Sequence, residues 1–438
     1  MGFQICFIVI FFLACSRGIG SQLLIQPEQI HLSYGERPNE MVVTWVTGNS
    51  TSLTVVEYGR RRLTQRALGN HTIFTDGGEL RRSMFIHRVK ITGLQPQTSY
   101  EYHVGSPAEG WSAIYSFRTV PEGVNWSPRF AIYGDMGNSN PQSLTRLQEE
   151  TQRGAFDAII HVGDIAYDMD SDNARVGDEF MRQIESVAAY IPYMTCPGNH
   201  ERAYNFSNYR NRFTMPGGDG TGMYYSWNVG PAHIVSFSTE VYYYYTTDGA
   251  AKRQYEWLEA DLIEANKAEN RALRPWIITT AHRPMYCSDS GEPDLCSTIL
   301  NFVRVGSKVY PKSLETLFYN YGVDLQFYGH NHNYERIWPV YNFKVCNGSR
   351  EYPYTNPKAP VHIITGSAGC FEKHGSFLKN RLPWSAFRDS DYGFSRMTIH
   401  NNTHLYLEQV SDDKNGTVVD KMWLKKDRHG AGTFDCLW

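Results

Sequence analysis

The 438-residue sequence lacks any apolar run long enough for a comfortable membrane span. Its longest apolar run, Phe3 to Cys15 at the N-terminus, falls short of the roughly 20 residues that a transmembrane helix needs. This length, followed by small and polar residues, is typical of a secretory signal peptide, although Lys and Arg are missing before the run. We therefore expect residues 1–21 to be a signal peptide and the mature protein to have no membrane anchor.

The sequence also lacks an excess of charge of either sign. It contains 42 Lys and Arg against 45 Asp and Glu, and its formal net charge is −3. Nucleic-acid-binding surfaces carry clusters of basic residues, so the absence of such clusters argues against nucleic acid as a partner. No internal repeat and no low-complexity tract is present. The length favours two globular domains.

Cysteine is scarce, with eight in the chain, of which two lie in the expected signal peptide. The remaining six are an even number, which can pair as disulfides in an oxidising compartment. They are Cys196, Cys287, Cys296, Cys346, Cys370 and Cys436. Cys287 and Cys296 are close in sequence and are the pair that we expect to be bonded; the other pairings stay open.

Seven Asn-x-Ser/Thr sequons point to the same compartment. A single sequon carries little information, but seven behind a signal peptide predict N-linked glycans on several of them. The candidate sites are Asn49, Asn70, Asn125, Asn205, Asn347, Asn401 and Asn415. We expect a secreted glycoprotein, either extracellular or lysosomal.

Two regions with different patterns make up the mature chain. Residues 22–120 contain short runs of alternating polar and apolar residues separated by turn residues, which is typical of a small all-β sandwich. Residues 121–128, PEGVNWSP, are expected to be a linker. From residue 129 to 438, predicted strands alternate with amphipathic helices, which indicates an α/β domain with largely buried sheets.

Metal-ligating residue types follow five predicted strands of the second region. In open α/β sheets, functional groups collect beyond the carboxyl ends of the strands. Here the groups are Asp135 in GDMG, Asp164 and Tyr167 in GDIAY, Asn199 and His200 in GNHE, His282 in TTAH, and His330 and His332 in GHNH. A glycine before several of these residues would let the backbone turn sharply at the strand end.

Each motif alone has a simpler explanation. A Gly-Asp pair is usually a turn, and a lone histidine after an apolar strand is more often hydrogen-bonded than metal-bound. Even the two histidines of GHNH, which project from one side of an extended chain, fit either a surface pair or two ligands. The five motifs in order, each behind a predicted strand, favour a shared metal site.

The number of ligands predicts two metal ions. Seven side chains, of which three are carboxylates or amides, three are imidazoles and one is a phenolate, would over-supply a single ion. If one carboxylate bridges two ions, each ion receives four protein ligands and keeps positions for water and substrate. Two cations about 3.5–4 Å apart neutralise charge and activate a bridging water, which suits hydrolysis at phosphorus.

The five motifs together resemble those of the purple acid phosphatases, in the metallophosphoesterase superfamily. The linker and the N-terminal β-region are similar to the family's longer, two-domain form, and MTCPGNHE, RPMYCS and HIITGSAGC are most similar to its animal iron/zinc form. The resemblance covers essentially the whole mature chain. It implies an α/β metallophosphoesterase sandwich, with two mixed sheets flanked by helices, preceded by a fibronectin-III-like β-domain.

The resemblance also implies a role for each ligand. A ferric ion would be held by Asp135, Tyr167 and His332, and Asp164 would bridge. The second divalent ion, zinc or iron, would be held by Asn199, His282 and His330. The implied enzyme is an acid phosphatase that hydrolyses small phosphate monoesters with a metal-activated hydroxide.

Residues around the metals carry further expectations from the resemblance. His200 would face the substrate and protonate the leaving alkoxide, and its alternative role is a structural hydrogen bond. Thr279 stands where valine is usual, at a position expected to pack. Many relatives have another substrate-contacting histidine shortly after the position of His282, and RPMYCSDSGEPDLC contains none. Arg283 and Tyr286 are the candidates to contact phosphate instead.

Two other functions stay open. The same metals would also support a phosphodiesterase or pyrophosphatase, depending on how open the site is. A secreted glycoprotein with a vestigial site and a partner-binding β-domain is the second alternative, although seven intact ligands argue against it. The physiological substrate and the oligomeric state stay unknown at this stage.

Overall fold

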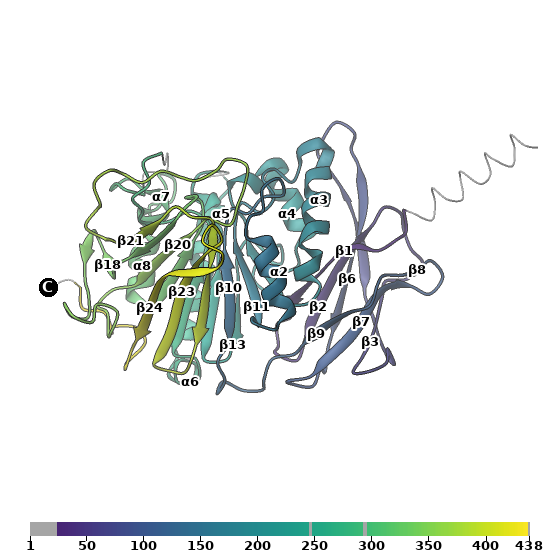
Figure 1. The fold of residues 1–438 in the computed structure, drawn as a ribbon, viewed down its shortest axis with the longest axis horizontal. Coiled ribbons are helices and arrows are strands. Elements are labelled where there is room, and N and C mark those ends of the chain that lie inside the picture. The colour runs from purple at the N-terminus through teal and green to yellow at the C-terminus, as the bar shows by residue number, and fades with distance from the viewer. Residues whose placement is uncertain (1–23, 245–247, 292–295, 437–438) are drawn as a thin grey trace, which may run out of the picture.

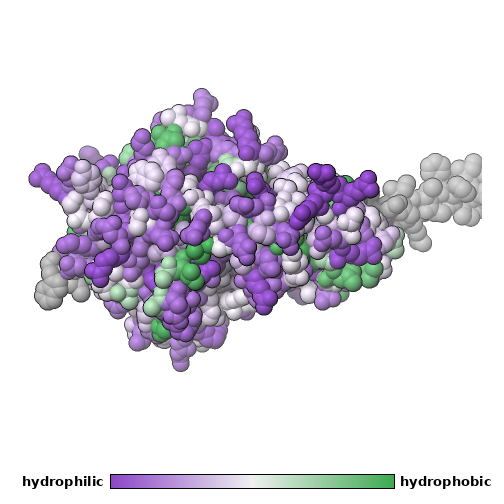
Figure 2. All heavy atoms as spheres, turned by 90° about the horizontal axis from the view of Figure 1, so that it is seen from below, coloured by the Kyte–Doolittle hydropathy of each residue, from purple (hydrophilic) through white to green (hydrophobic). Residues whose placement is uncertain are grey.

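The computed structural model describes residues 24–244, 248–291 and 296–436. The expected signal peptide, residues 1–21, lies outside the described residues. Within the described part of the chain, no helix is long and apolar enough to cross a bilayer. The N-terminal strands lie at one end of the long axis and the C-terminal strands toward the other (Figure 1). Hydrophilic residues cover most of the face seen in Figure 2, with only small hydrophobic spots between them.

Two antiparallel sheets form the N-terminal domain. One contains β1 (Glu28–Tyr34), β2 (Met41–Thr47), β6 (Ser83–Ile91) and β5 (Asn70–Thr75). The other contains β4 (Gln65–Leu68), β3 (Val55–Gly59), β7 (Ser99–Ser106), β8 (Gly110–Trp111) and β9 (Tyr115–Arg118). Side chains such as Trp45, Val43 and Tyr102 are fully buried in the core of this domain. The prediction of an all-β N-terminal domain is confirmed.

Two mixed sheets form the second domain. The six-stranded sheet has the order β12 (Tyr193–Cys196), β11 (Ala158–Val162), β10 (Arg129–Tyr133), β22 (Gly393–Ile399), β23 (His404–Ser411), β24 (Thr417–Lys425). The seven-stranded sheet has the order β13 (Tyr225–Val229), β14 (Ala232–Ser236), β15 (Trp276–Thr280), β16 (Leu325–Tyr328), β20 (Val361–Thr365), β17 (Tyr334–Ile337), β21 (Ser385–Asp389). Strands β10 to β12 run parallel, as do β14, β15, β16 and β20. These strands are buried along almost their whole length, as expected of parallel strands covered on both faces.

Helices flank the sheets. They are α2 (Leu144–Gln152), α3 (Ser171–Ala188), α4 (Ala203–Arg212), α5 (Ala250–Ala265), α6 (Ala268–Leu273), α7 (Phe302–Val305) and α8 (Leu314–Asn320), and a small ribbon is formed by β18 (Val340–Tyr341) and β19 (Lys344–Val345). Helix α3 also packs against β1 of the N-terminal domain. There the buried Arg212 pairs with Asp178 at 2.9 Å and donates to Gln29 at 3.0 Å. The expected arrangement, two mixed sheets flanked by helices and preceded by a β-domain, is confirmed.

Two disulfides are formed among the described residues. Cys287 pairs with Cys296, as expected, and Cys346 pairs with Cys436, a pairing that the sequence left open. The second bond ties the C-terminal end of the chain to the segment before β20. Cys196 and Cys370 are unpaired and buried.

Candidate metal centre

Both sheets of the second domain contribute to one cluster of polar side chains. The six-stranded sheet supplies oxygen ligands, with Asp135 after β10, Asp164 after β11 and Asn199 after β12. The seven-stranded sheet supplies imidazoles, with His282 after β15 and the pair His330 and His332 after β16. The parallel strands of each sheet end at one edge, and the two edges meet here. This arrangement explains why ligands far apart in the sequence converge.

One half of the cluster is centred on His282. Its Nε2 atom lies 3.0 Å from Oδ2 of Asp164, 3.2 Å from Oδ1 of Asn199 and 3.1 Å from Nδ1 of His330. Ligand atoms of Asp164, His282 and His330 all lie within 4.8 Å of one another. This half brings together the residues expected to hold the second ion.

The other half is centred on Tyr167. Its hydroxyl lies 2.7 Å from Nε2 of His332 and donates to Oδ1 of Asp135 at 3.2 Å. Nε2 of His332 is 3.5 Å from that same carboxylate oxygen. The backbone N–H of His330 donates to Oδ2 of Asp135 at 2.8 Å, which joins the two halves. All seven expected ligands thus lie in one cluster.

The hydrogen bonds of His282 show that a cation fits this cluster. Nδ1 of His282 lies 2.9 Å from the carbonyl oxygen of Val162, so it carries the proton and donates it there. In the neutral ring, Nε2 then holds a lone pair that faces the oxygens of Asp164 and Asn199, an arrangement that is repulsive unless a proton or a metal cation lies between them. Ligands bound at about 2.0–2.2 Å from one metal lie about 3.0–3.4 Å apart, which matches the observed contacts.

The pKa values show the same preference for positive charge. Burial lowers the pKa of His282, but Asp164 and Asp135 outweigh burial, and the net shift is upward. For His332, burial is again outweighed, here by Asp135 and Cys370, which raise its pKa to about 12. Burial raises the pKa of Asp164, but His282 and His200 outweigh it and hold the pKa well below the usual range. The carboxylates thus create a potential that favours cations.

The backbone is strained where the ligands lie. Asp135, Asp164, Tyr167 and His330 all have left-handed φ values between 47° and 69°. Such values cost energy in non-glycine residues and gather at functional sites. Gly198 is required for close approach rather than for a turn, because a Cβ atom there would lie 2.2 Å from Oδ1 of Asp164.

His200 faces the cluster beside these ligands. Its Nδ1 lies 3.0 Å from Oδ1 of Asp168, and its Nε2 lies 3.9 Å from Oδ2 of Asp164. Burial lowers the pKa of His200, but Asp164 and Asp168 outweigh it and raise the pKa to about 9. These carboxylates favour a protonated ring, and its Nε2 lies on the side of Asp164.

Of the two residues suggested to replace the missing histidine, Arg283 contacts the cluster and Tyr286 lies away from it. Nε of the buried Arg283 donates to both carboxylate oxygens of Glu240, at 2.9 and 3.0 Å, and its Nη1 lies 3.0 Å from Nε2 of His330. The guanidinium of Arg283 is bonded to Glu240, and this geometry does not favour a direct phosphate contact. Tyr286 is fully buried, and its hydroxyl donates to Glu315 inside the fold.

Sequence reasoning missed several residues beside the cluster. Glu201 accepts backbone N–H groups from Asp164, Ile165 and Gly198 at 2.8–3.0 Å, and it therefore fixes two ligand loops together. It stands in the GNHE motif, so its position next to His200 was a usable signal. Glu372, whose Oε1 lies 3.7 Å from Nε2 of His200, comes from a loop far along the chain and had no such signal.

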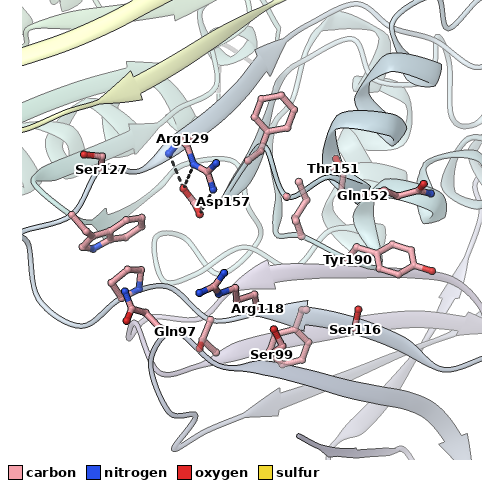
Figure 3. Close-up of a pocket in the computed structure, with 17 residues that line it drawn as sticks. Gln97, Ser99, Ser116, Arg118, Ser127, Arg129, Thr151, Gln152, Asp157 and Tyr190 are labelled. Carbon is pink, nitrogen blue, oxygen red and sulfur yellow. Dashed lines mark hydrogen bonds and ion pairs between the residues drawn. The ribbon is translucent and has the colours of Figure 1, made fainter. Parts of the chain in front are cut away.

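A separate cavity of about 490 Å³ lies between the two domains, where Arg118 and Arg129 extend beside Asp157 (Figure 3). Nε of Arg129 lies 3.5 Å from Oδ2 of Asp157. Among the described residues that line this cavity, Asp157 is the one carboxylate, and histidine and cysteine are absent. The cavity therefore offers no set of metal ligands comparable to the cluster.

Comparison with known families identifies three consecutive matches. Residues 27–119 match the purple acid phosphatase N-terminal domain, residues 128–334 match the calcineurin-like phosphoesterase domain, and residues 359–421 match the iron/zinc purple acid phosphatase-like protein C domain. Together these matches span most of the chain.

Individual relatives agree with the domain matches. The chain is 59% identical over 413 residues to acid phosphatase type 7 of Danio rerio, covering 92% of each protein. It is 29% identical over 418 residues to Fe(3+)-Zn(2+) purple acid phosphatase 12 of Arabidopsis thaliana, covering 91% of this chain and 84% of that one. The structure of a purple acid phosphatase from yellow lupin seeds superposes with a TM-score of 0.76 at 26% identity, covering 92% of this chain and 75% of that chain.

Proposed function

The chain belongs to the purple acid phosphatase family, and on that premise we propose that it is an acid phosphatase acting on small phosphate monoesters. Its cofactor is a dinuclear centre of iron with a second iron or zinc ion. The observation that carries the proposal is the convergence of seven ligand side chains from two sheets on one point. A vestigial site is not favoured, because no expected ligand is missing from the cluster.

The assignment of ligands follows the two halves of the cluster. The ferric ion would be held by Asp135, Tyr167 and His332, and the second ion by Asn199, His282 and His330. Asp164 would contribute to both. The contacts around Tyr167 and around His282 support this division. A phenolate is a hard oxygen donor, which suits the ferric ion.

When bound, the two ions supply charge neutralisation at the phosphate and an activated water. The residues of the chain orient the ligand side chains and protonate the leaving group. His200 holds a proton at Nε2 for the leaving oxygen, while Asp168 accepts the Nδ1–H and fixes the ring. The carbonyl groups of Val162 and Lys373 bond Nδ1 of His282 and His332, which directs both Nε2 lone pairs into the site.

The same proposal includes a secreted glycoprotein. Two disulfides support an oxidising compartment. Six of the seven sequon asparagines are exposed, and Asn347 is partly buried. Asn125 and Asn401, which are distant in sequence, line one hollow of about 360 Å³, so glycans on both would be neighbours.

The proposal is tested on protein purified from a secretory host. We expect two metal ions per chain by mass spectrometry, at least one of them iron, a visible colour, and hydrolysis of p-nitrophenyl phosphate. Bis(p-nitrophenyl) phosphate, measured in parallel, tests the phosphodiesterase alternative and should be turned over far more slowly. Metal-loaded protein without monoesterase activity would overturn the proposal.

A further inference from the structure

The loop Cys370–Gly375 lies where the leaving group of a substrate must pass. Nε2 of His200 is 3.7 Å from Oε1 of Glu372 and 3.9 Å from Oδ2 of Asp164. Because His200 gives its proton to the leaving oxygen, the group attached to that oxygen must lie beside Nε2. It therefore also lies beside Glu372.

This loop is anchored to the metal site. The N–H of Cys370 donates to the carbonyl of Met136 at 2.6 Å, and the N–H of Gly375 donates to the carbonyl of His332 at 3.0 Å. Nδ1–H of His332 donates to the carbonyl of Lys373 at 2.9 Å. The intervening residues 371–374, with Phe371 and Glu372 among them, are consequently held beside the site by bonds on both sides.

Phe371 extends an aromatic wall away from His200. The ring of Tyr167 lies 4.4 Å from the ring of His200, and the ring of Phe371 lies 5.5 Å from that of Tyr167 in an edge-on arrangement. Phe371 is 54% exposed. Its open surface is therefore available to an apolar or aromatic leaving group.

The charge beside the wall is negative. Two carboxylates approach Nε2 of His200 within 4 Å, and bound metal ions would neutralise one of them, Asp164. Glu372 is then the remaining carboxylate within 4 Å of Nε2. Arg202, the nearby cation, donates to the carbonyl of Asn199 and lies over the ring of Tyr244 at 5.3 Å. It is thus held on the Asn199 side of the site.

We propose that Phe371 and Glu372 form a leaving-group subsite. This subsite selects esters of neutral or cationic aromatic alcohols and disfavours leaving groups that carry further negative charge, such as a second phosphate. The inference rests on the proposed phosphatase function, and it names the substrate class of that same site.

The charge preference is tested with two esters that share a ring, phenyl phosphate and 4-carboxyphenyl phosphate. For Glu372→Gln we expect the ratio of kcat/KM for the charged ester to that for the neutral one to rise about 5- to 10-fold, as for removal of a partly screened charge. The intrinsic reactivity of each ester cancels when variant and wild type are compared. The rise should shrink in concentrated salt, because the two charges are then screened.

The matched control is Glu79→Gln, an exposed glutamate of the N-terminal domain, which should leave the ratio unchanged. An equal ratio in wild type and Glu372→Gln would overturn the charge preference. If neither ester is hydrolysed, the phosphatase function itself fails. The affinities of benzylphosphonate and 4-carboxybenzylphosphonate, measured by calorimetry, then test the charge preference of the subsite without turnover.

The aromatic preference is tested with benzylphosphonate and methylphosphonate, which bind without reacting. Phe371→Ala should weaken benzylphosphonate about 3- to 10-fold, as for loss of one aromatic contact, and change methylphosphonate less than about 2-fold. Phe371→Tyr, which keeps the ring, should restore the preference, and Leu80→Ala is the control for an exposed apolar side chain. Equal effects of Phe371→Ala on both phosphonates would contradict a contact between the Phe371 ring and the leaving group.

Discussion

Buried histidines occur in the N-terminal sandwich and in the metal cluster, with opposite electrostatics. In the sandwich, His87 lies between the hydroxyls of Thr47 and Thr54, each at 2.8 Å, and its ring stacks on Trp45. Burial lowers its pKa to about 3. His282 is buried as deeply in the cluster, but Asp164 and Asp135 raise its pKa.

The direction of the histidine pKa shift depends on the residues around the ring and not on the domain in which the histidine lies. His161 and His362 belong to the second domain, and burial lowers the pKa of each to about 3. Neither is bonded to a carboxylate in the described part of the chain. A buried histidine is therefore a packing residue where hydroxyls and rings surround it. It is a candidate ligand where carboxylates and other imidazoles face the same point.

Removing the carboxylate at the centre of the cluster should have the largest effect. We expect Asp164→Ala to lose both metal ions and all measurable activity, because one carboxylate serves both ions and its loss breaks two coordination spheres. Metal analysis by mass spectrometry and turnover of p-nitrophenyl phosphate measure the two losses. Full activity with both ions retained would show that Asp164 does not bridge.

The next largest effect should come from His200, which we propose as the general acid and not as a metal ligand. His200→Ala should keep both ions and lower turnover by about 10²–10⁴-fold, the usual contribution of a general acid. The deficit should shrink for esters with good leaving groups, because these need little protonation.

A series of aryl phosphates with different phenol pKa values checks this dependence for His200→Ala. Metal content measured on the same samples is the control. A deficit of equal size across the series would assign His200 a structural role.

Changing His87 should affect stability and not the metals. Its folded pKa, about 3, lies below the ordinary value near 6.5, so its contribution to stability is complete above pH 6.5 and is lost as pH falls toward 3. Between pH 6.5 and 4.5, wild type should lose about 2–3 kcal/mol more unfolding free energy than His87→Gln. Denaturant titrations across this range measure the difference.

His87→Gln should also keep the metal content and turnover of wild type at neutral pH, which makes it the counterpart of Asp164→Ala. Parallel stability curves for His87→Gln and wild type would mean that His87 is not held neutral by burial. Loss of metal from this variant would break the distinction between the two classes of histidine.

Much of the fold was predictable because the strands that carry ligands are short apolar runs. Most of these runs are followed by a motif that contains glycine. Helix α3 is harder to recognise, since Asp172, Asn173 and Ala174 in its first turn have left-handed φ values and its start is polar. At the site, the ligands could be predicted because each lies within a few residues of the end of a strand. Glu372 and the Glu240 partner of Arg283 could not, because tertiary packing alone brings them there.

The central claim is that a ferric ion binds in the half of the cluster formed by Asp135, Tyr167 and His332. A substitution of Tyr167 tests this claim most directly. Tyr167→Phe removes one oxygen and leaves the ring to pack, so the fold should be kept and activity should survive in part through the remaining ligands. The visible absorption spectrum of iron-loaded protein is the measurement. The account predicts that the phenolate-to-iron band is bleached in the variant; an unchanged band with iron still bound would contradict it.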